Sequence, residues 1–420
     1  MVQKRLDDFF EMKEKRLLEK DDLIADLHLH SKYSGATSKS MDLKSIAQAA
    51  KIKGLNLIGT GDCLHAKWLS ELKTTLKPSD GEFYEYNGIL FVVSGEVNTI
   101  FSDEGKLHKI HNLIIVPSLE KADEMSKKLA KYGDLLSDGR PTLYMSAAEL
   151  VEEATSIDND IEIIPAHIWT PWFSLFGANS GFDSVEECFK DKSSKIHSLE
   201  TGLSSDPEMN WMISRLDRFN LLSNSDAHSH HLWRIGREAN VLRVMQPTFK
   251  MLIKALRTGE GIKLTLEVPP EFGKYHWSGH RNCKVALSPE EAMKASNICP
   301  KCGKKLTIGV EQRVYMLADR KKGFIPPNKP PFVKVLPLQE ILKFILGSNS
   351  YASKNVMRIY DSLIERYGNE YEVLLNAPIN EIKSFNKELA LIIEQLRQNK
   401  VKIKPGYDGV YGELEFNISN

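Results

Sequence analysis

Short apolar segments alternate with amphipathic ones over residues 23–262, and this alternation predicts strands separated by helices. Signals for helix ends lie between several of the apolar segments: Asp42 and Gly54 bracket one amphipathic stretch, and Ser146 and Glu149 have the spacing of a capping box. Strand–helix alternation is typical of parallel strands with right-handed crossovers, and about seven repeats favour a barrel over an open sheet. The predicted strands cover residues 23–28, 56–61, 90–96, 110–116, 161–167, 196–200 and 220–225.

Side chains that can bind metals gather where these strands end. In the segment Asp26-Leu27-His28-Leu29-His30, alternate side chains share one face of an extended strand, so Asp26 and both histidines face away from the leucines. Most other candidates also follow a strand, although His111 lies at the start of its own apolar segment. Because the carboxyl ends of barrel strands meet at one mouth, the sequence predicts a multinuclear metal site there. The residues concerned are His28, His30, Asp62, His65, Glu96, His111, His167, Asp226 and His228.

Each of these residues taken alone has a structural explanation. His111 has the surroundings of a buried core histidine, and Asp62 has those of a turn cap. It is their common placement at one end of the predicted barrel that favours the metal site over these explanations.

A second metal site is predicted from the cysteines. Cys283, Cys299 and Cys302 lie close together and, with His280, give a His-x-x-Cys pair and a Cys-x-x-Cys pair. This is the ligand set of a closed structural zinc site. His276 is an alternative to His280, and a redox-active Cys-x-x-Cys is an alternative to zinc, although the third cysteine argues against it.

The composition is that of a soluble globular protein, since 42% of the residues are hydrophobic and 27% are charged. No apolar run reaches the roughly 18 residues of a transmembrane helix, and residues 1–22 lack the apolar core of a signal peptide. The odd number of cysteines argues for a reducing compartment. We therefore expect a cytoplasmic protein with no membrane contact.

Basic residues are concentrated in the second half of the chain, although the net charge is zero. Residues 281–343 contain 13 lysines and arginines against 5 aspartates and glutamates. Such a region is a candidate contact to a phosphate backbone, although an ordinary solvated face has the same composition.

Four regions are predicted from these patterns. Residues 1–22 form an N-terminal extension, 23–265 the barrel, 266–335 a zinc-binding domain with a proline-rich linker, and 336–420 a helical domain with a tail. Apolar stripes at helical spacing support the last region. The predicted fold class is α/β: a distorted barrel followed by a small zinc-binding domain and a C-terminal helical domain.

The motifs of the predicted barrel resemble the polymerase and histidinol phosphatase (PHP) family of phosphoesterases. The resemblance covers residues 26–262 and rests on residues 26–31, Gly95-Glu96, His111, 165–167 and 225–229. It implies a (β/α)7 PHP barrel with a three-metal cluster whose ligands are all nine residues named above. Zn²⁺ is the expected ion, with Mg²⁺ or Mn²⁺ as alternatives in the catalytic cluster.

One motif departs from that family. Two residues separate Asp62 from His65, whereas the corresponding pair is usually adjacent in the family. The residues expected to act most directly in catalysis are Glu96, which would bridge two metals, with Asp226 and His65.

The order of the regions, together with residues 167–173, 200–206 and 405–412, resembles the endonuclease Q family. The resemblance runs from residue 23 to residue 416. It implies a metal-dependent DNA repair endonuclease that cuts 5′ to a deaminated base (uracil, hypoxanthine or xanthine) or an abasic site, leaving 3′-hydroxyl and 5′-phosphate ends. The expected partner is lesion-containing DNA, single- or double-stranded, in the nucleoid.

An enzyme that inspects a base must take it out of the stack, which calls for an aromatic and partly polar pocket near the metals. Trp169, Trp172, Phe173 and Ser174 follow His167 directly, and Arg237 follows the last ligand motif. We expect these five residues to contact substrate. Packing of the barrel mouth is the alternative for the aromatic residues.

Three other functions remain open at this point. A small-molecule phosphomonoesterase explains the barrel but not the cysteine cluster or the basic region. A PHP-family exonuclease would act from strand ends and could not start on circular DNA, and a non-catalytic DNA-binding module predicts missing ligands. The C-terminal residues contain no convincing sliding-clamp peptide, so a clamp partner has no support from the sequence.

Overall fold

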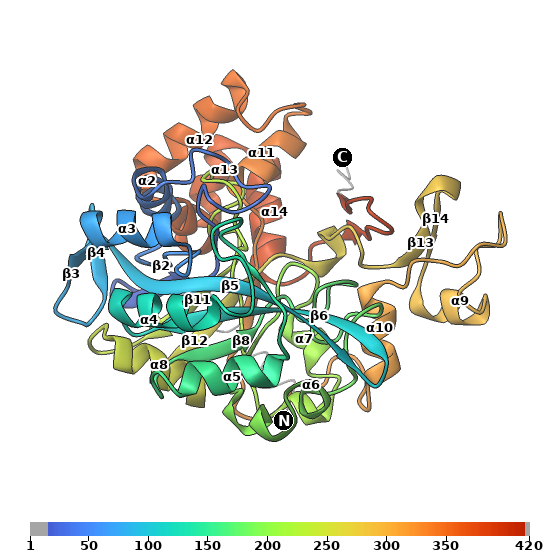
Figure 1. The fold of residues 1–420 in the computed structure, drawn as a ribbon. Helices are drawn as coiled ribbons and strands as arrows, with labels where there is room; N and C mark the ends of the chain where they lie inside the picture. Colours follow the sequence, from blue (N-terminus) through green and yellow to red (C-terminus); the bar gives the residue numbers. More distant parts are fainter. Residues whose placement is uncertain (1–15, 416–420) are drawn as a thin grey trace.

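The computed structural model describes residues 16–415, and its centre is a barrel of seven short and long strands. Hydrogen bonds join five of them into one sheet and the other two into a second sheet. The ring is completed by packing of β8 on β9 and by a bridge between Leu29 and Ala227, just past β1 and β10. The seven strands are β1 (Asp22–Asp26), β2 (Leu57–Gly59), β5 (Ile89–Asp103), β6 (Lys106–Val116), β8 (Glu162–Pro165), β9 (Ser198–Glu200) and β10 (Asn220–Leu222). The long strands β5 and β6 cross the middle of the molecule (Figure 1).

The predicted distorted barrel is present, but its strands are not all parallel. β1, β2 and β5 are parallel to one another, whereas β6 is antiparallel to both of its neighbours. The reason is the two-residue turn Glu104-Gly105, in which both residues have positive φ. A two-residue turn of this kind joins antiparallel strands, and a crossover would need a dozen or more residues.

Helices pack around the barrel, and the predicted caps are confirmed. Asp42 accepts a hydrogen bond from the Ser45 backbone N–H, Gly54 ends the same helix in the left-handed conformation, and Ser146 with Glu149 forms the capping box. The helices are α2 (Leu43–Lys53), α3 (Ala66–Thr75), α4 (Leu119–Leu129), α5 (Ala147–Thr155), α6 (Val185–Phe189), η2 (Lys190–Lys195), α7 (Pro207–Asn210), η3 (Ser214–Leu216) and α8 (Phe249–Thr258).

Further strands extend the sheet at both edges. One of them, β15 (Phe332–Lys334), lies in the segment predicted to be a linker, where Phe332 and Val333 are buried and the strand pairs with β12. The proline-rich segment is therefore partly built into the sheet. The other strands are β3 (Lys77–Pro78), β4 (Tyr84–Tyr86), β7 (Thr142–Leu143), β11 (Ala239–Arg243) and β12 (Ile262–Glu267).

The cysteine-containing segment forms a small lobe that projects from the body (Figure 1, right). Its own hydrophobic cluster consists of Val285, Ala292, Cys299 and Leu306. The C-terminal tail returns to the base of this lobe, where Tyr407 pairs with Trp277. The elements of this part are η4 (Pro270–Phe272), β13 (Ser278–His280), η5 (Arg281–Cys283), β14 (Val285–Leu287), α9 (Pro289–Lys294), α10 (Val310–Leu317), β16 (Ile403–Lys404) and β17 (Glu413–Leu414).

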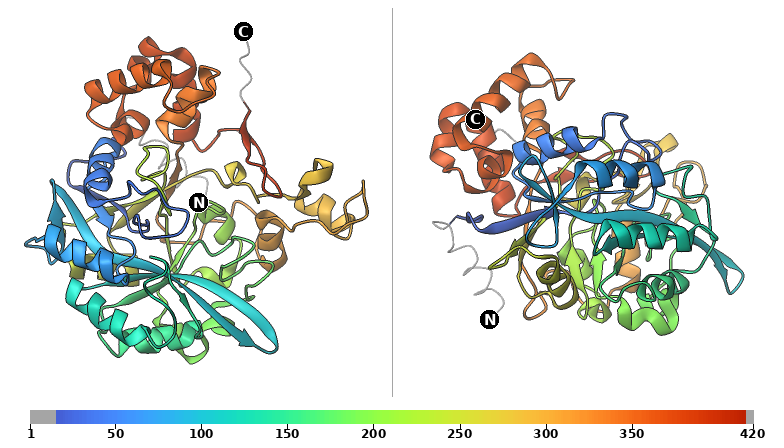
Figure 2. Two further views of the ribbon diagram at one scale, coloured as in Figure 1. Left: turned by 45° about the horizontal axis from the view of Figure 1, so that its top comes forward. Right: turned by 60° about the vertical axis from the view of Figure 1, so that its left-hand side comes forward.

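The predicted helical domain sits on one side of the barrel next to α2 (Figure 2). A buried ion pair joins the two, since Lys53 Nζ lies 2.7 Å from Glu370 Oε1. The helices are α11 (Leu338–Ile345), α12 (Lys354–Tyr367), the π-helical turn η6 (Glu372–Asn376), α13 (Ile379–Phe385) and α14 (Lys387–Arg397).

The predicted N-terminal extension falls mostly on residues 1–15, which lie outside the described residues. Within the described part, Leu18 is buried and hydrogen-bonds to Asn376. No helix between residues 16 and 415 has the length and apolar character needed to cross a membrane.

Candidate metal centre

Two groups of metal-binding side chains meet at the barrel mouth, and Glu96 belongs to both. His28, His30 and Asp226 form the first group with Glu96, and His111 and His167 form the second. Glu96 Oε2 faces the first group, 3.2 Å from His30 Nε2 and 3.5 Å from His28 Nε2. Glu96 Oε1 faces the second, 2.6 Å from His111 Nδ1 and 3.1 Å from His167 Nε2. A carboxylate with its two oxygens directed to different sets of imidazoles has the geometry of a bridging ligand.

The strand directions explain why these residues meet. His28 and His30 follow β1, Glu96 lies inside the long strand β5, and His167 follows β8. His111 lies in the middle of β6 and comes to the same mouth because β6 runs antiparallel. The reversed strand thus accounts for the one candidate that did not follow its apolar segment.

Three candidate residues occupy unusual backbone conformations. Asp62, His167 and Asp226 have φ values of 46°, 32° and 47°. Positive φ costs energy in a residue with a side chain, and such residues cluster at functional sites, where the surrounding structure holds them in place. The three residues all lie just past the ends of barrel strands.

Buried groups of both charges act on one another in this site. Burial alone raises the pKa of Glu96, but His111, Arg140 and His28 together hold its pKa well below the usual range. Burial likewise lowers the pKa of His28, but Glu200 and Glu96 raise it well above the usual value. Carboxylates that favour positive charge on an imidazole also favour a cation between them.

The donor set fits metal ions. The ligand atoms within each group lie within 4.8 Å of one another. His28 Nε2 is buried without a hydrogen-bond partner among the described residues, while its Nδ1 is held by Glu200 at 2.9 Å. A histidine with one nitrogen fixed by a carboxylate and the other free toward the site is arranged as a metal ligand usually is.

Three of the nine predicted ligands lie outside the two groups. Asp62 accepts hydrogen bonds from Ser31 and Ser34 and lies 3.2 Å from His30 Nδ1, so it orients His30 in this structure. The His228 ring packs at a tilt against the His30 ring with 4.3 Å between ring centroids, and its Nδ1 lies 3.5 Å from Asp226 Oδ1.

His65, the third of them, is turned away from the cluster. Its Nδ1 caps α3 by accepting the Trp68 backbone N–H, and its Nε2 lies 3.2 Å from the carbonyl oxygen of Leu136. The two residues between Asp62 and His65 carry the chain from the strand end to the start of the helix, which explains this placement.

Asp26 shares a face with His28 in the sequence but does not join the metal groups. Its carboxylate is fully buried and accepts the backbone N–H groups of Ser225 and Gly236, each at 3.0 Å. Asp26 therefore holds both ends of the loop 225–236, which contains Asp226 and His228.

Two residues of the site were missed in the sequence. Glu200 binds His28 Nδ1 and the backbone N–H of His167, and thus orients both histidines. Arg140 lies 3.3 Å from Glu96 and is partly exposed, so it presents a positive charge at the mouth. The preceding Gly139 is required, because a Cβ there would lie 2.3 Å from an Asp62 oxygen. A Gly-Arg pair in a loop carries no sequence signal for this role.

The five predicted substrate contacts differ in accessibility. Trp169 and Ser174 are buried: Trp169 donates its indole N–H to Asn210, and Ser174 donates to the Thr170 carbonyl. Trp172 is 42% exposed and meets Tyr275 edge to face. Phe173 packs 5.2 Å from the His111 ring. The fifth, Arg237, donates to the carbonyl oxygen of Ser225, next to Asp226.

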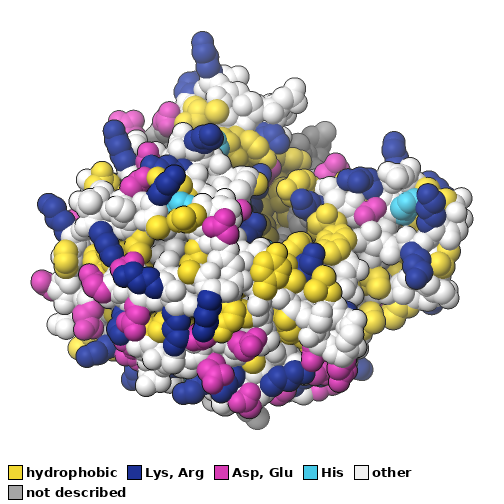
Figure 3. All heavy atoms as spheres, in the orientation of Figure 1, with side chains coloured by type: hydrophobic (Ala, Val, Ile, Leu, Met, Phe, Trp, Pro, Cys, Tyr) yellow, Lys and Arg dark blue, Asp and Glu magenta, His cyan; other side chains and the backbone are white. Residues whose placement is uncertain are grey.

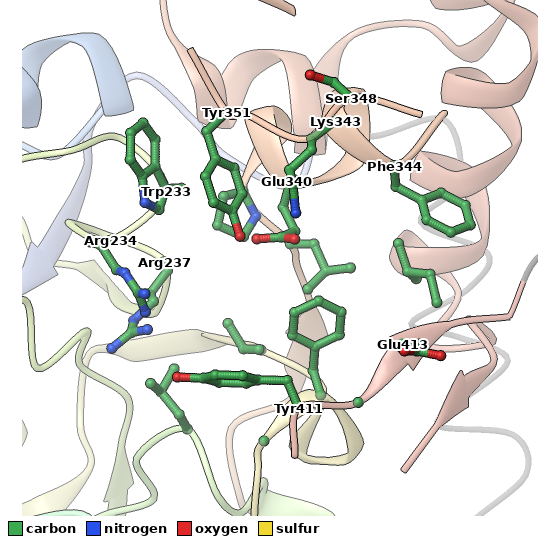
Figure 4. Close-up of a pocket in the computed structure, with 18 of the residues that line it drawn as sticks. Trp233, Arg234, Arg237, Glu340, Lys343, Phe344, Ser348, Tyr351, Tyr411 and Glu413 are labelled. Atoms are coloured by element: carbon green, nitrogen blue, oxygen red, sulfur yellow. The ribbon is translucent and has the colours of Figure 1, made fainter. Parts of the chain in front are cut away.

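A pocket of about 660 Å³ opens beside Arg237, between the barrel, the helical domain and the tail (Figure 4). Arg234 and Arg237 point into it from the barrel side, Lys343 and Tyr351 from the helical domain, and Tyr411 from the tail. Trp233 stacks on Tyr351 with 4.7 Å between ring centroids. In such a pocket, aromatic faces can stack on a nucleotide base and cationic groups can contact its phosphate. The sequence did not reveal this pocket because its walls come from three distant segments.

The cysteine cluster forms the third group of possible metal ligands among the described residues. His280, Cys283, Cys299 and Cys302 supply its four atoms, and His280 Nδ1 lies 3.3 Å from Cys302 Sγ. His276, the alternative to His280, lies instead 3.4 Å from Glu311. Although burial raises it, backbone N–H groups of Lys301 and Cys302 lower the pKa of Cys299 to about 6, which favours the thiolate that binds metal.

The basic region is only partly free to contact a partner. The Arg320 guanidinium donates two hydrogen bonds to the Asp217 carboxylate, and Lys322 Nζ lies 3.4 Å from Glu311 Oε1. Lysines and arginines remain exposed on the projecting lobe (Figure 3, right). Of the predicted basic groups, those at Lys301, Lys304 and Lys305 are exposed there.

Comparisons with known proteins agree with this description. The helical segment 337–400 matches the family described as the MJ0043 C-terminal domain. The uncharacterized protein MJ0043 of Methanocaldococcus jannaschii is 36% identical over 253 residues, which is 59% of this chain and 31% of that protein. The chain thus spans about a third of that relative. The uncharacterized protein YqxK of Bacillus subtilis is 28% identical over 94% of this chain and 99% of its own length.

Two solved structures are similar over nearly the whole chain. The lesion-specific endonuclease PfuEndoQ of Pyrococcus furiosus has a TM-score of 0.85 and 38% identity, covering 94% of this chain and 96% of its own. Endonuclease Q in complex with a 27-mer duplex that has an abasic lesion at the active site has a TM-score of 0.84 and 38% identity, covering 94% and 97%. Similarity of this extent covers the barrel, the cysteine lobe and the helical domain together, and the chain belongs to the endonuclease Q family.

Proposed function

We propose that this protein is a metal-dependent DNA repair endonuclease. It hydrolyses the phosphodiester bond 5′ to a deaminated base (uracil, hypoxanthine or xanthine) or an abasic site, and leaves a 3′-hydroxyl and a 5′-phosphate. The observation that carries the proposal is the placement of Glu96 between two groups of histidines at the barrel mouth, in a chain 38% identical to an endonuclease bound to lesion DNA.

The residues at the mouth have distinct roles in this reaction. Glu96, His28, His30 and Asp226 would hold one cation, and Glu96, His111 and His167 would hold another. His228 and Asp62 lie beside the first group as further candidate ligands, whereas both ring nitrogens of His65 are engaged elsewhere. When bound, divalent cations polarise a phosphoryl oxygen, activate water near neutral pH and stabilise the leaving oxygen. Glu200 keeps His28 and His167 in place, and Arg140 neutralises charge on the phosphate.

Zn²⁺ is the proposed ion of the site formed by His280 and the three cysteines, because thiolate and imidazole ligands in a four-atom group suit it. In the barrel cluster, imidazole and carboxylate ligands suit Zn²⁺, with Mg²⁺ or Mn²⁺ as alternatives. Removal of the barrel metals by a chelator and replacement by each ion in turn identifies the one that supports cleavage.

The pocket beside Arg237 is the proposed place for the extruded nucleotide. Arg237 links it to Asp226 through Ser225, so a nucleotide there has its phosphate near the metal cluster. Trp169 and Ser174, which the sequence suggested as substrate contacts, are buried. In this proposal the base instead contacts Trp233, Tyr351 and Tyr411, which line the pocket. Trp172 lies outside this pocket and, by its exposure, is placed to contact the duplex.

Replacement of Tyr411 by alanine is expected to lower cleavage of lesion DNA about tenfold, since stacking of a base on an aromatic ring is worth roughly 1–3 kcal/mol. Single-turnover cleavage of a deoxyuridine duplex measures the effect. Tyr144→Ala is the matched control, because Tyr144 is 73% exposed and lies in neither the pocket nor a metal group. Equal rates for the two variants would remove Tyr411 from the substrate site.

Trp172→Ala is expected to lower cleavage of lesion DNA by a similar factor, about tenfold, with the metal content unchanged. The reason is that Trp172 is 42% exposed, meets Tyr275 edge to face and belongs to neither metal group of the barrel. Metal analysis and cleavage are measured on the same preparation. Unchanged cleavage would show that Trp172 only packs the mouth.

The proposed function is tested with a duplex that contains one deoxyuridine or deoxyinosine and a label at its 5′ end. A single cut immediately 5′ to the lesion, absent from undamaged duplex, is the expected result. A ladder from the end would indicate the exonuclease, and closed circular lesion DNA would then remain uncut. Hydrolysis of a free phosphomonoester without DNA cleavage would indicate the small-molecule phosphatase. The cytoplasmic location stays a prediction, and a sliding-clamp partner stays without support from the sequence.

A further inference from the structure

The loop 226–236 joins the metal centre to the C-terminal helical domain. Its first residue, Asp226, belongs to the metal centre, and its last, Gly236, lies under the helical domain. Asp26 ties the two ends together through the backbone N–H groups of Ser225 and Gly236. A displacement at Gly236 is therefore passed to the residues beside Asp226.

Three contacts hold this loop: two come from the helical domain, and the third comes from Lys53 of α2, which is itself paired with Glu370 of the helical domain. The Tyr371 hydroxyl donates to the carbonyl oxygen of Gly236. Lys53 Nζ donates both to the carbonyl oxygen of Leu232 at 2.8 Å and to Glu370 at 2.7 Å. Trp233 stacks on Tyr351. The contacts fall on Leu232, Trp233 and Gly236, so they hold the C-terminal half of the loop.

Glu370 makes this attachment rigid. Its Oε1 also accepts the Leu338 backbone N–H at 2.9 Å, and its Oε2 accepts the Tyr360 hydroxyl at 2.8 Å. Glu370 thus ties α11, α12 and Lys53 together at a point that is fully buried. Lys53 is 1% exposed, so the pair is shielded from water and salt.

There is no spare space at the contact. Gly236 has a φ of +58°, and a Cβ there would lie 2.8 Å from Lys53 Cγ and 3.0 Å from the Tyr371 hydroxyl oxygen. The backbone of the loop is pressed directly against the two residues that hold it. Close packing of this kind transmits small shifts instead of absorbing them.

We propose that the C-terminal helical domain positions the metal centre: through Tyr371 and the Lys53–Glu370 pair, its seating on the barrel sets the place of Asp226 and His228. Tyr371 and Glu370 are positioning residues, since they act on the cluster through the loop. The proposal rests on the proposed metal site. In it, the seating of the helical domain on the barrel controls both metal affinity and turnover.

The test compares Tyr371→Phe with Tyr367→Phe. Each removes one phenolic hydroxyl, but that of Tyr367 bonds to Glu381 within the helical domain and is remote from the loop. Tyr371→Phe is expected to weaken Mn²⁺ binding, measured by calorimetry on metal-stripped protein, about tenfold, the size of effect seen for groups that orient metal ligands. Its kcat should fall with little change in KM for lesion DNA, and amide exchange of residues 226–236 should rise. Tyr367→Phe should leave all three unchanged.

Equal Mn²⁺ affinity and equal loop exchange in the two variants would overturn the proposal. A fall in thermal stability alone, without these changes, would give Tyr371 a merely structural role and would also overturn it. The double variant Lys53→Met/Glu370→Met provides a second test, because it removes the buried pair without leaving a lone charge; it too should weaken Mn²⁺ binding. Mn²⁺ binding without DNA cleavage in the wild type would refute the proposed function but leave this inference standing.

Discussion

Asp226→Asn is expected to abolish cleavage of lesion DNA, with a loss of about a thousandfold or more. Asp226 Oδ1 lies 3.1 Å from His30 Nε2 and 3.7 Å from His28 Nε2, in the first group of metal ligands. The amide has the size of the carboxylate but lacks its charge, so the fold is kept while the cation is held weakly. Metal ions contribute several kcal/mol to phosphoryl transfer, and about 1.4 kcal/mol corresponds to a factor of ten.

The measurement is single-turnover cleavage of a duplex with one deoxyuridine, beside metal analysis of the same protein. Asp191→Asn is the matched control, because its carboxylate is exposed on η2, pairs with the neighbouring Lys192 and belongs to no metal group of the described residues. Binding of lesion DNA by Asp226→Asn should persist, since one negative charge near the phosphates is removed. Cleavage by Asp226→Asn at the wild-type rate would place the reaction outside the barrel mouth.

Cys299→Ser is expected to unfold the projecting lobe. The hydrophobic cluster of the lobe has four members, one of which is Cys299 itself, and so it is too small to hold the lobe together. Binding of a structural Zn²⁺ contributes roughly 10–16 kcal/mol in small domains of this type. Loss of one thiolate should therefore remove one Zn²⁺ per chain and expose residues 280–306 to protease.

The same variant should bind lesion DNA at least about tenfold more weakly, because the lobe presents Lys301, Lys304 and Lys305 to a phosphate backbone. Cys188→Ala is the control: Cys188 is buried in α6 and lies outside the metal groups, so zinc and DNA affinity should be kept. Full zinc content in Cys299→Ser would exclude the proposed ligand set. Unchanged DNA affinity with the zinc lost would remove the lobe from the DNA interface.

Local patterns identified much of the site. Alternation of His28 and His30 with leucines placed both on one strand face, and the spacing of His280, Cys283, Cys299 and Cys302 predicted a group that the structure brings together. These predictions were possible because strand periodicity and short ligand spacings depend on neighbouring residues only. The caps of α2 and α5 were predicted for the same reason.

The residues that connect distant segments were not predictable in this way. Arg140 is 44 residues from Glu96 in the sequence, and Glu200 is 172 residues from His28. Lys53 and Glu370 are separated by 317 residues. His65 lies close to Asp62 in sequence, yet its side chain caps a helix and faces away from the cluster.

The sequence by itself indicated the seven barrel strands, the ends of α2 and α5 and the candidate ligands, because each depends on periodicity or spacing within a short segment. Only the tertiary structure decided the direction of β6, which brings His111 to the mouth, and the seating of the helical domain on the loop of Asp226. It also decided the burial of Trp169 and the pocket between three regions. Burial and long-range contact are properties of the packed chain, and no short segment contains them.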